Sequence, residues 1–482
     1  MKTRVLLVVV AIFILLLVLS QFIPGLQTTL VVTPSSESAL VRTPTSSSVL
    51  FSTPTASIPN GLQVTPAALK GIHISFWYPW VGKMGDAISG LIADFNKTNP
   101  YGITVEERRL GGEQDLWEQV SQSVLDNATP NMVVAPTEQL VAWQSPQQEF
   151  VDMNDYVFSA TYGLTPMQQS DFFSSIWNAD VMDDIRFGVP ATRTGQVLFY
   201  NITWAKELGF NSPPTTAADF KSQACAAAHA NSSLQQKKKF GTGGWLIDAG
   251  WQTDISWLFA FDFNSYPKNG SSGFSFETNQ FENAQSFLRD LFEKGCAWYP
   301  QNNNPQTPQA YFAGRFALFY SGDLEQISSQ FGAQDEANSK DEWAVIPFPG
   351  EDGHPAFLVH GDSYAVFLST PEDQLASWLF IRWMEQTENQ IKLIEAEGSL
   401  PLTYSAVQAL TDYSNGRTQW ESVIQYSDNA GTPPNNAYWL EVRPVLEDSF
   451  TMLLSPQYLT ANIPNMAKVL DATIQDVLTQ KP

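Results

Sequence analysis

Polar side chains that could bind a small molecule stand directly before a predicted buried strand. The run Ala191–Gln196 precedes an unbroken apolar stretch, Val197–Tyr200. Apolar stretches without alternation are typical of strands buried on both faces, as in a parallel α/β sheet, so the polar run marks the entry to such a sheet. If the chain crosses there from one lobe to another, Thr192, Arg193 and Thr194 face a cleft. Their hydroxyl and guanidinium groups could bond the hydroxyls or a carboxylate of a ligand.

Aromatic residues could supply the other half of such a site. Sugars are recognised by aromatic faces that stack on their C–H surfaces and by polar groups that bond their hydroxyls. Trp77, Tyr78 and Trp80 follow the first predicted strand, and Trp245 and Trp251 lie in a Gly-rich stretch. We predict that these residues stack on a ligand, with a place in the core or at the cleft rim as the alternative.

Further polar candidates stand where predicted elements end. They are Glu113, Asp323, Asp362, Tyr404 and Arg443. Asp323 could instead cap a helix that begins there, and Glu113 could be an ordinary surface residue. Arg193 either contacts the ligand or braces a hinge through a salt bridge. A phosphate-bearing ligand would favour roles for both Arg193 and Arg443.

Motifs of the common enzyme classes are missing from the sequence. The four histidines have no metal-binding spacing, and there is no H-E-x-x-H or G-x-S-x-G motif. We therefore expect no cofactor and no catalytic residue. Carboxylates are numerous enough that a glycosidase pair stays open as an alternative.

Length and charge narrow the class of protein. A chain of 482 residues is too long for one core, so two or more lobes are expected. The formal net charge is −23, and almost all of the negative charge lies after residue 69. Nucleic-acid binding depends on Lys and Arg contacts to phosphates, so this balance argues against a nucleic-acid partner.

The N-terminus has the pattern of an export signal. Lys2 and Arg4 precede a long apolar run, and no cleavage site of small residues follows it. We predict an uncleaved hydrophobic anchor helix over residues 1–26 on the extracellular face of the plasma membrane, with a cleaved signal peptide and secretion as the alternative. Residues 27–69 are rich in Ser, Thr and Pro, which indicates a disordered linker.

The two cysteines, Cys225 and Cys296, both lie in the exported body of the chain. An even count outside the cytoplasm favours one disulfide, and two separate buried thiols are the alternative.

The elements that must position these residues begin with a β-α-β unit. A strand is predicted over residues 71–78, a helix ends at Asn99-Pro100, and a second strand covers residues 103–107. Parallel strands joined in this way bind ligands near their carboxyl ends. Later strands are predicted over residues 314–320, 343–348 and 363–368.

Five stretches occur in a characteristic order along residues 71–470. They are Ile74–Trp77 with Leu91–Pro100, Phe187–Pro190 through Leu198–Asn201, Leu208–Phe210 with Pro213–Thr216, Phe312–Leu318, and Glu397–Pro401. In this order and spacing the chain resembles the family 1 extracellular solute-binding proteins of ABC importers, the maltose-binding-like group. It lacks the lipid-bearing Cys that usually follows the signal in that family, so the predicted anchor takes the place of a lipid.

The resemblance implies an α/β fold of the periplasmic-binding-protein type, in which two lobes joined by crossover strands close on a solute. Lobe 1 would comprise residues 70–190 plus 366–405, and lobe 2 residues 191–365 plus 406–482. The implied function is a carbohydrate receptor that serves the membrane subunits of an ABC permease. The alternatives are a secreted carbohydrate-active enzyme and a surface binding protein without a transport role.

Overall fold

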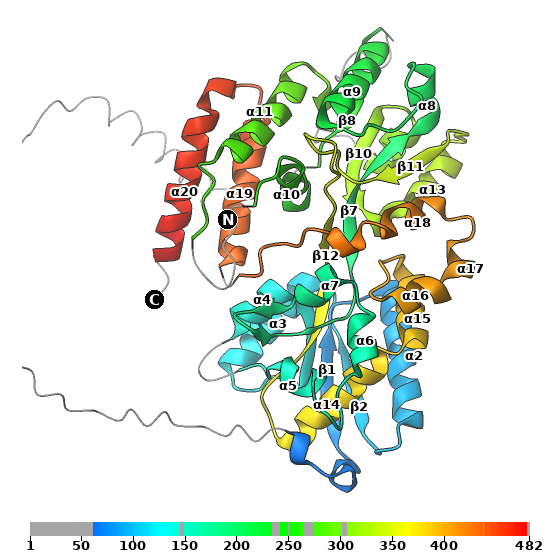
Figure 1. Ribbon diagram of the computed structural model, residues 1–482, viewed down its shortest axis with the longest axis vertical. Helices are drawn as coiled ribbons and strands as arrows, with labels where there is room; N and C mark the ends of the chain where they lie inside the picture. The colour runs from blue at the N-terminus through cyan, green and yellow to red at the C-terminus, as the bar shows by residue number, and fades with distance from the viewer. Residues whose placement is uncertain are drawn as a thin grey trace, which may run out of the picture. The chain divides into compact units, whose positions relative to one another are not determined.

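Two β-sheets, each flanked by helices, organise the protein in the computed structural model (Figure 1). The structure describes residues 61–144, 149–233, 242–248, 250–264, 273–300, 306–436 and 438–479. The predicted anchor helix and most of the predicted linker lie outside these residues. Across the described part of the chain, no helix combines the length and apolar character that a membrane span requires.

The first sheet has the strand order β2-β1-β3-β13-β6. Its strands are β1 (His73–Tyr78), β2 (Thr104–Arg109), β3 (Met132–Pro136), β6 (Val189–Pro190) and β13 (Asp362–Val366). β1 runs parallel to β2 and β3, as the predicted β-α-β unit requires, whereas β13 runs antiparallel to β3 and β6. We call this sheet and its helices lobe 1.

The second sheet has the order β11-β7-β10-β8-β9, and β12 also pairs with β7. Its strands are β7 (Thr194–Asn201), β8 (Gly243–Leu246), β9 (Ala297–Trp298), β10 (Ala317–Asp323), β11 (Trp343–Ile346) and β12 (Leu358–His360). All eight residues of β7 are buried, which confirms the predicted burial on both faces. The inferred parallel pairing of β7 is wrong, because β10, β11 and β12 all run antiparallel to it. This sheet and its helices form lobe 2.

Helices cover both sheets (Figure 1). Before β7 these are α2 (Gly82–Thr98), α3 (Glu113–Leu125), α4 (Thr137–Trp143), α5 (Met153–Val157), α6 (Pro166–Ser170) and α7 (Ser174–Asn178), with a small hairpin of β4 (Val181–Met182) and β5 (Ile185–Arg186). Between β7 and β12 they are α8 (Ile202–Glu207), α9 (Ala217–Ser232), α10 (Trp251–Ala260), α11 (Asn279–Glu293), α12 (Pro308–Ala313) and α13 (Ile327–Glu336). After β13 they are α14 (Pro371–Met384), α15 (Thr387–Glu397), α16 (Tyr404–Ala409), α17 (Thr411–Ser414), α18 (Thr418–Ile424), α19 (Trp439–Leu453) and α20 (Ile463–Thr479).

Local sequence signals set several helix starts. The Asn201 side chain accepts a hydrogen bond from the Trp204 amide and so caps α8. Thr216 and Asp219 form a complete capping box at the start of α9. Thr370 caps α14, with Pro371 as its first residue.

The chain crosses directly from strand to strand between the two sheets at two places, and it returns to lobe 2 a third time after α15, since α18 packs on β11 and α19 on α10. The chain passes from β6 to β7 through residues 191–193, and from β12 to β13 through Gly361. The amides of Ala191 and Thr192 donate to the carbonyl of Asp362, which ties the crossings together. Gly361 has φ +148°, and a Cβ there would lie 2.4 Å from the Thr192 carbonyl oxygen, so only glycine fits.

Two predicted boundaries need correction. Residues 362–365 were assigned to lobe 2, but β13 belongs to the lobe 1 sheet, because the strand begins directly after the crossing. The linker was predicted to reach residue 69, yet Leu69 is fully buried in the core and the Val64 carbonyl accepts a hydrogen bond from Tyr162. Apolar residues inside the otherwise polar stretch therefore attach the last part of the linker, from residue 61, to the body.

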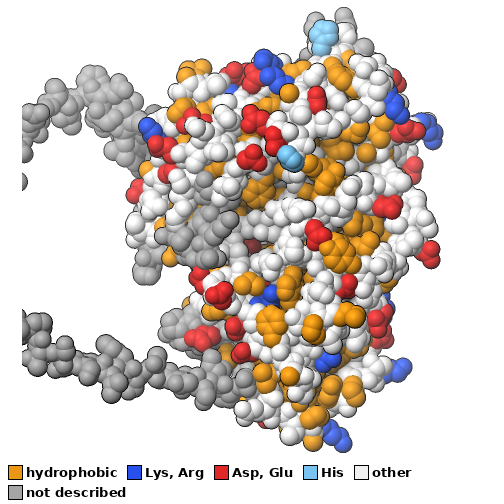
Figure 2. Space-filling view, viewed as in Figure 1, with side chains coloured by type: hydrophobic (Ala, Val, Ile, Leu, Met, Phe, Trp, Pro, Cys, Tyr) orange, Lys and Arg blue, Asp and Glu red, His pale blue; other side chains and the backbone are white. Residues whose placement is uncertain are grey.

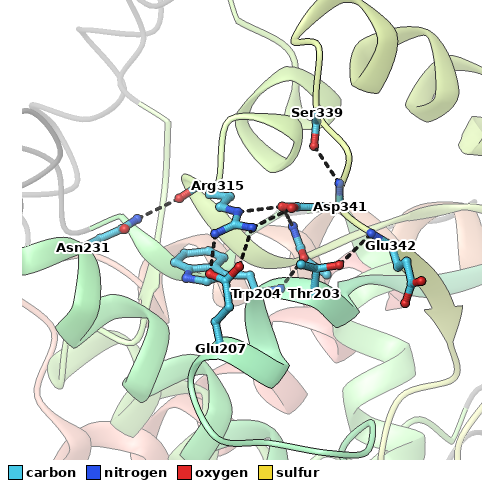
Figure 3. A network of polar contacts seen from close by, with 9 residues as sticks. Thr203, Trp204, Glu207, Asn231, Arg315, Ser339, Asp341 and Glu342 are labelled. Carbon is cyan, nitrogen blue, oxygen red and sulfur yellow. Dashed lines mark hydrogen bonds and ion pairs between the residues drawn. The ribbon is translucent and has the colours of Figure 1, made fainter.

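A polar network fixes the end of β7 that lies away from the crossing (Figure 3). Arg315 donates to both carboxylate oxygens of Asp341 at 2.6 Å and to Glu207. Asn201, the last residue of β7, donates to Asp341 at 2.8 Å. The network holds β7, α8 and β11 together, so the strand that enters at the crossing is held at both ends.

Cys225 of α9 and Cys296, just before β9, form the predicted disulfide. The bond closes a loop with a sequence separation of 71 residues. In the chain-entropy model, closing a loop of this length with a disulfide stabilises a fold by about 4 kcal/mol.

We predict that Cys225→Ala combined with Cys296→Ala lowers the free energy of unfolding by about 2–4 kcal/mol, measured by urea unfolding. The oxidised and reduced wild-type protein should differ by a similar amount, and equal stability of the two forms would contradict this role.

Candidate functional site

A cavity of about 400 Å³ lies at the crossings and takes its walls from both lobes. Ligand pockets in proteins usually measure about 300–1,000 Å³. Trp80, Glu113 and Glu138 line it from lobe 1, and Trp251 and Asp323 line it from lobe 2. The predicted polar run Thr192–Thr194 also lines it, so the sequence correctly placed this run at a cleft.

Arg193 is held mainly by protein groups. Its side chain is buried, and one terminal nitrogen donates to both oxygens of Asp180 at 3.0 Å and to the Ser363 hydroxyl at 2.9 Å. The other terminal nitrogen donates to the carbonyls of Thr192 and Asp362. The guanidinium therefore joins residues of both crossings, which is the hinge-bracing role that the sequence left open.

Two tryptophans line the cavity from different lobes. The Trp80 indole nitrogen donates to Asp362 at 3.0 Å, which fixes the ring. Trp251, at the start of α10, packs edge-on against His360 with ring centroids 5.7 Å apart. Both were predicted from the sequence, and a pair of fixed aromatic rings is the apolar half of a sugar site.

Trp77 and Tyr78, predicted as stacking residues, do not line the cavity. Successive side chains of a strand point to opposite faces, and both residues lie within β1 rather than beyond its end. Tyr78 is fully buried in the lobe 1 core, where its hydroxyl bonds Glu107 and Ser89. Trp77 lies on the other face, with the Arg108 guanidinium 4.3 Å from its ring centroid. The prediction for these two residues is therefore wrong in this structure.

Trp245 and Tyr404 also lie away from the cavity. Trp245 is fully buried on β8 in the lobe 2 core, and its indole nitrogen donates to Ser321 at 3.0 Å. The Gly-rich stretch that suggested exposure instead allows α9 to pack closely on the strand, since a Cβ at Gly243 would lie 2.4 Å from the Ala227 carbonyl. Tyr404 is 41% exposed on α16, where its hydroxyl donates to Asp428.

Six carboxylates line the cavity. They are Glu113, Glu138, Asp323, Glu325, Asp362 and Glu397. Glu138 pairs with Arg443 at 3.6 Å, and Asp323 bonds His360 at 3.0 Å, so Asp323 does not use its side chain as a helix cap. Burial alone would lower the pKa of His360, but the bond to Asp323 raises it above its usual value.

Burial gives several of these carboxyls unusual proton affinities. Burial and the nearby Glu113 carboxylate raise the pKa of Asp362 to about 7. Burial and the neighbouring Glu397 raise the pKa of Glu325 well above its usual range. Burial also raises the pKa values of Glu138 and Glu397. Acidic groups crowded into a partly closed cavity thus hold protons that they would lose in water.

The sequence did not single out Glu138, Glu325 and Glu397 as site residues. Glu138 stands two residues after the end of β3, and Glu325 stands two residues after Asp323. Those positions carry a usable signal, because ligand groups gather at strand ends. Glu397 ends α15 and begins Glu397–Pro401, one of the five stretches that carry the family resemblance.

We predict that the unliganded protein loses stability as the pH rises from 5 to 8. Asp362 titrates near pH 7 in the folded chain but near pH 4 when unfolded. In this window the folded state binds more protons, so the free energy of unfolding falls with rising pH. Asp362→Asn should remove about 2 kcal/mol of that loss, measured by urea unfolding at both pH values. An unchanged pH slope in the variant would contradict the raised pKa.

No group of three or more His, Cys, Asp or Glu in the described residues could hold a metal ion. The face shown in Figure 2 carries acidic side chains throughout, and its basic side chains are scattered rather than gathered into a patch. This surface is unlike that of nucleic-acid-binding proteins, which present clustered Lys and Arg.

Comparisons with known proteins identify relatives of the chain. A family model described as bacterial extracellular solute-binding protein matches residues 90–418. No curated protein sequence matches the chain significantly.

Solved structures share the fold at low sequence identity. The sugar-binding protein MalE from Xanthomonas citri superposes with a TM-score of 0.69 at 19% identity, covering 85% of this chain and 100% of MalE. The cyclic alpha-maltosyl-1,6-maltose binding protein from Arthrobacter globiformis gives 0.68 at 15%, covering 84% and 99%. UgpB from Mycobacterium tuberculosis, in complex with glycerophosphocholine, gives 0.66 at 14%, covering 84% and 98%. The predicted two-lobed α/β fold is confirmed.

Proposed function

The chain belongs to the bacterial extracellular solute-binding proteins, and from this membership we propose that it is the carbohydrate receptor of an ABC importer. The observation that carries the proposal is the cavity at the crossings, which has one fixed tryptophan from each lobe, Trp80 and Trp251. Carboxylates that accept hydrogen bonds from sugar hydroxyls surround the two rings.

The solved neighbours support a saccharide as the ligand. Four of them bind cyclic maltosyl-maltose, cycloalternan, maltotriose and mannotriose. One neighbour instead binds glycerophosphocholine, a phosphodiester. In the present cavity Arg193 is paired with Asp180 and Arg443 with Glu138. With both guanidiniums held by carboxylates, a phosphate group would meet further acidic groups and neither guanidinium would be free to pair with it, so we favour a sugar.

The receptor would act by lobe closure without chemistry. The two strand-to-strand crossings tied together near Arg193 form part of the hinge, and a ligand that contacts Trp80 and Trp251 stabilises the closed arrangement. The membrane subunits of the permease would then recognise the closed form and accept the solute. The clustered carboxylates resemble the acid pair of a glycosidase, which would cleave a bound sugar. A receptor releases its sugar uncleaved, so recovery of intact sugar distinguishes the two functions.

We further propose that residues 1–26 anchor the receptor on the outer face of the plasma membrane and that the linker holds the body away from it. Deleting residues 5–23 while supplying a cleavable signal should move the protein from the membrane fraction to the medium. An N-terminus in the mature wild-type protein that begins after residue 26 would contradict the anchor and favour secretion after cleavage.

A thermal-shift screen tests the proposed function. Neutral and charged di- and trisaccharides, glycerol phosphodiesters and short peptides are added at millimolar concentration. A true ligand raises the midpoint by mass action, and we expect this from a saccharide. Chromatography of the released ligand should show no cleavage. A shift produced only by phosphodiesters or peptides would overturn the carbohydrate assignment, and cleavage of the sugar would overturn the receptor role.

A further inference from the structure

We propose that the solute of this receptor carries a protonated amine, so that its substrates are oligosaccharides of amino sugars. The inference rests on the proposed carbohydrate function and names the class of sugar. It follows from the balance of charge in the cavity and from which of its charged groups already have partners.

Each cation among the described residues that line the cavity already interacts with a carboxylate. Arg193 pairs with Asp180 at 3.0 Å, and Arg443 lies 3.6 Å from Glu138. His360 bonds Asp323. None of these three side chains is left to neutralise a further carboxylate, and an anionic ligand would find no free cation among them.

Four carboxylates remain without a cation. Glu113, Glu325, Asp362 and Glu397 line the cavity, and none of them forms an ion pair within the described residues. Asp362 is only 6% exposed and accepts a neutral hydrogen bond from Trp80. Burying like charges together is unfavourable unless a positive group joins them. Burial, with neighbouring carboxylates as a further cause, raises the pKa values of Glu325 and Asp362, and burial raises that of Glu397.

The four carboxylates come from different parts of the fold. Glu113 begins α3, Asp362 begins β13 at the crossing, and Glu397 ends α15, all in lobe 1, whereas Glu325 follows β10 in lobe 2. Their placement around one cavity is a feature of the tertiary structure rather than of one acidic segment. A single cation bound between the lobes could interact with carboxylates of both and so favour closure.

A second observation points to a ligand at the same place. Thr194 is 6% exposed and lines the cavity, and its hydroxyl lies near Glu325 but outside hydrogen-bonding geometry with any protein group. Buried hydroxyls normally have a partner, so this one is available to a ligand. The rings of Trp80 and Trp251 also suit a cationic sugar, because an aromatic face attracts an ammonium group.

Two disaccharides that differ only in charge provide the test. Cellobiose is a β-1,4-linked glucose dimer, and the chitosan disaccharide is the same dimer with an amine in place of each C2 hydroxyl. Calorimetric titration of the full chain at pH 7, where Asp362 is partly ionised, and at low salt should show at least tenfold tighter binding of the aminated dimer. The preference should shrink as salt is raised, because salt screens charge–charge attraction.

Matched variants test whether the preference for the aminated disaccharide arises from the cavity carboxylates. Glu397→Gln keeps the shape of the side chain and should weaken binding of the chitosan disaccharide at least fivefold more than it weakens binding of cellobiose. Glu395→Gln, on the exposed side of the same helix, should leave both affinities unchanged. The thermal unfolding midpoints of both variants show whether they fold. If Glu397→Gln does not fold, the same binding measurements are made on Glu325→Gln.

The outcomes separate this inference from the proposed function. If cellobiose binds as tightly as the aminated dimer, or if only other neutral sugars bind, the amine requirement is overturned and the carbohydrate function stands. If spermidine, a cation without a sugar ring, binds while no saccharide does, both the amino-sugar class and the carbohydrate function are overturned. If Glu397→Gln and Glu325→Gln both leave the preference intact, the carboxylates are not its cause and the inference fails.

Discussion

Arg193→Met is expected to lower the free energy of unfolding by about 3–5 kcal/mol. The substitution leaves Asp180, whose side chain is fully buried, without its cation. It also removes hydrogen bonds to Ser363 and to the carbonyls of both crossings. The measurement is urea unfolding of the variant beside the wild type. This effect is larger than the others predicted here because a buried charge without a partner is so unfavourable.

Two controls distinguish the effect of losing the buried charge pair from the effect of losing a long side chain. Combining Arg193→Met with Asp180→Leu should recover part of the lost stability, because no unpaired charge then remains. Arg109→Met breaks a pair with Asp86 whose side chains are 36% and 78% exposed, and it should cost less than about 1 kcal/mol. Equal losses for Arg193→Met and Arg109→Met would contradict the hinge brace.

Trp251→Ala is expected to weaken binding of the saccharide identified in the screen by about 30- to 100-fold. Truncating a central aromatic anchor typically costs about 2–3 kcal/mol, and 1.4 kcal/mol corresponds to a factor of about ten. Trp251 lines the cavity from lobe 2 and its ring is held by contacts with His360 and Trp439. Calorimetric titration measures the change.

Trp77→Ala provides the matched control for the tryptophan substitution. Trp77 is an aromatic residue of the same predicted group, but it lies outside the cavity against Arg108. Its loss should leave the affinity within about twofold, a change of about 0.4 kcal/mol. Equal weakening by Trp77→Ala and Trp251→Ala, or none by either, would refute the assignment of the cavity as the binding site.

Much of the fold could be predicted because its signals are local. The helix starts at Asn201, Thr216 and Thr370 follow from side chains that bond the backbone two or three residues ahead. The burial of β7 follows from its unbroken apolar sequence. The direction of its neighbours could not be predicted in the same way, because strand pairing depends on residues more than a hundred positions away.

The site was predicted only in part, for a related reason. Thr192–Thr194, Trp80 and Asp362 lie at the crossings, which the order of the elements indicates. Glu325 and Glu397 are distant in sequence and meet only when the two lobes are assembled. Trp245 has a sequence setting like that of Trp251, yet Trp245 lies on β8 inside the lobe 2 core, whereas Trp251 begins α10 at the cavity.

Hydrogen–deuterium exchange with and without the best saccharide tests the central claim most directly. The account predicts slower exchange in three segments that line the cavity from both lobes, around Trp80, Thr192 and Trp251. Backbone amides near the Arg315 network, which lies at the end of β7 away from the crossing, should exchange at the same rate with and without the sugar. Protection confined to one lobe, or absent from all three segments while the sugar is bound, would contradict a receptor that closes on a carbohydrate at this cavity.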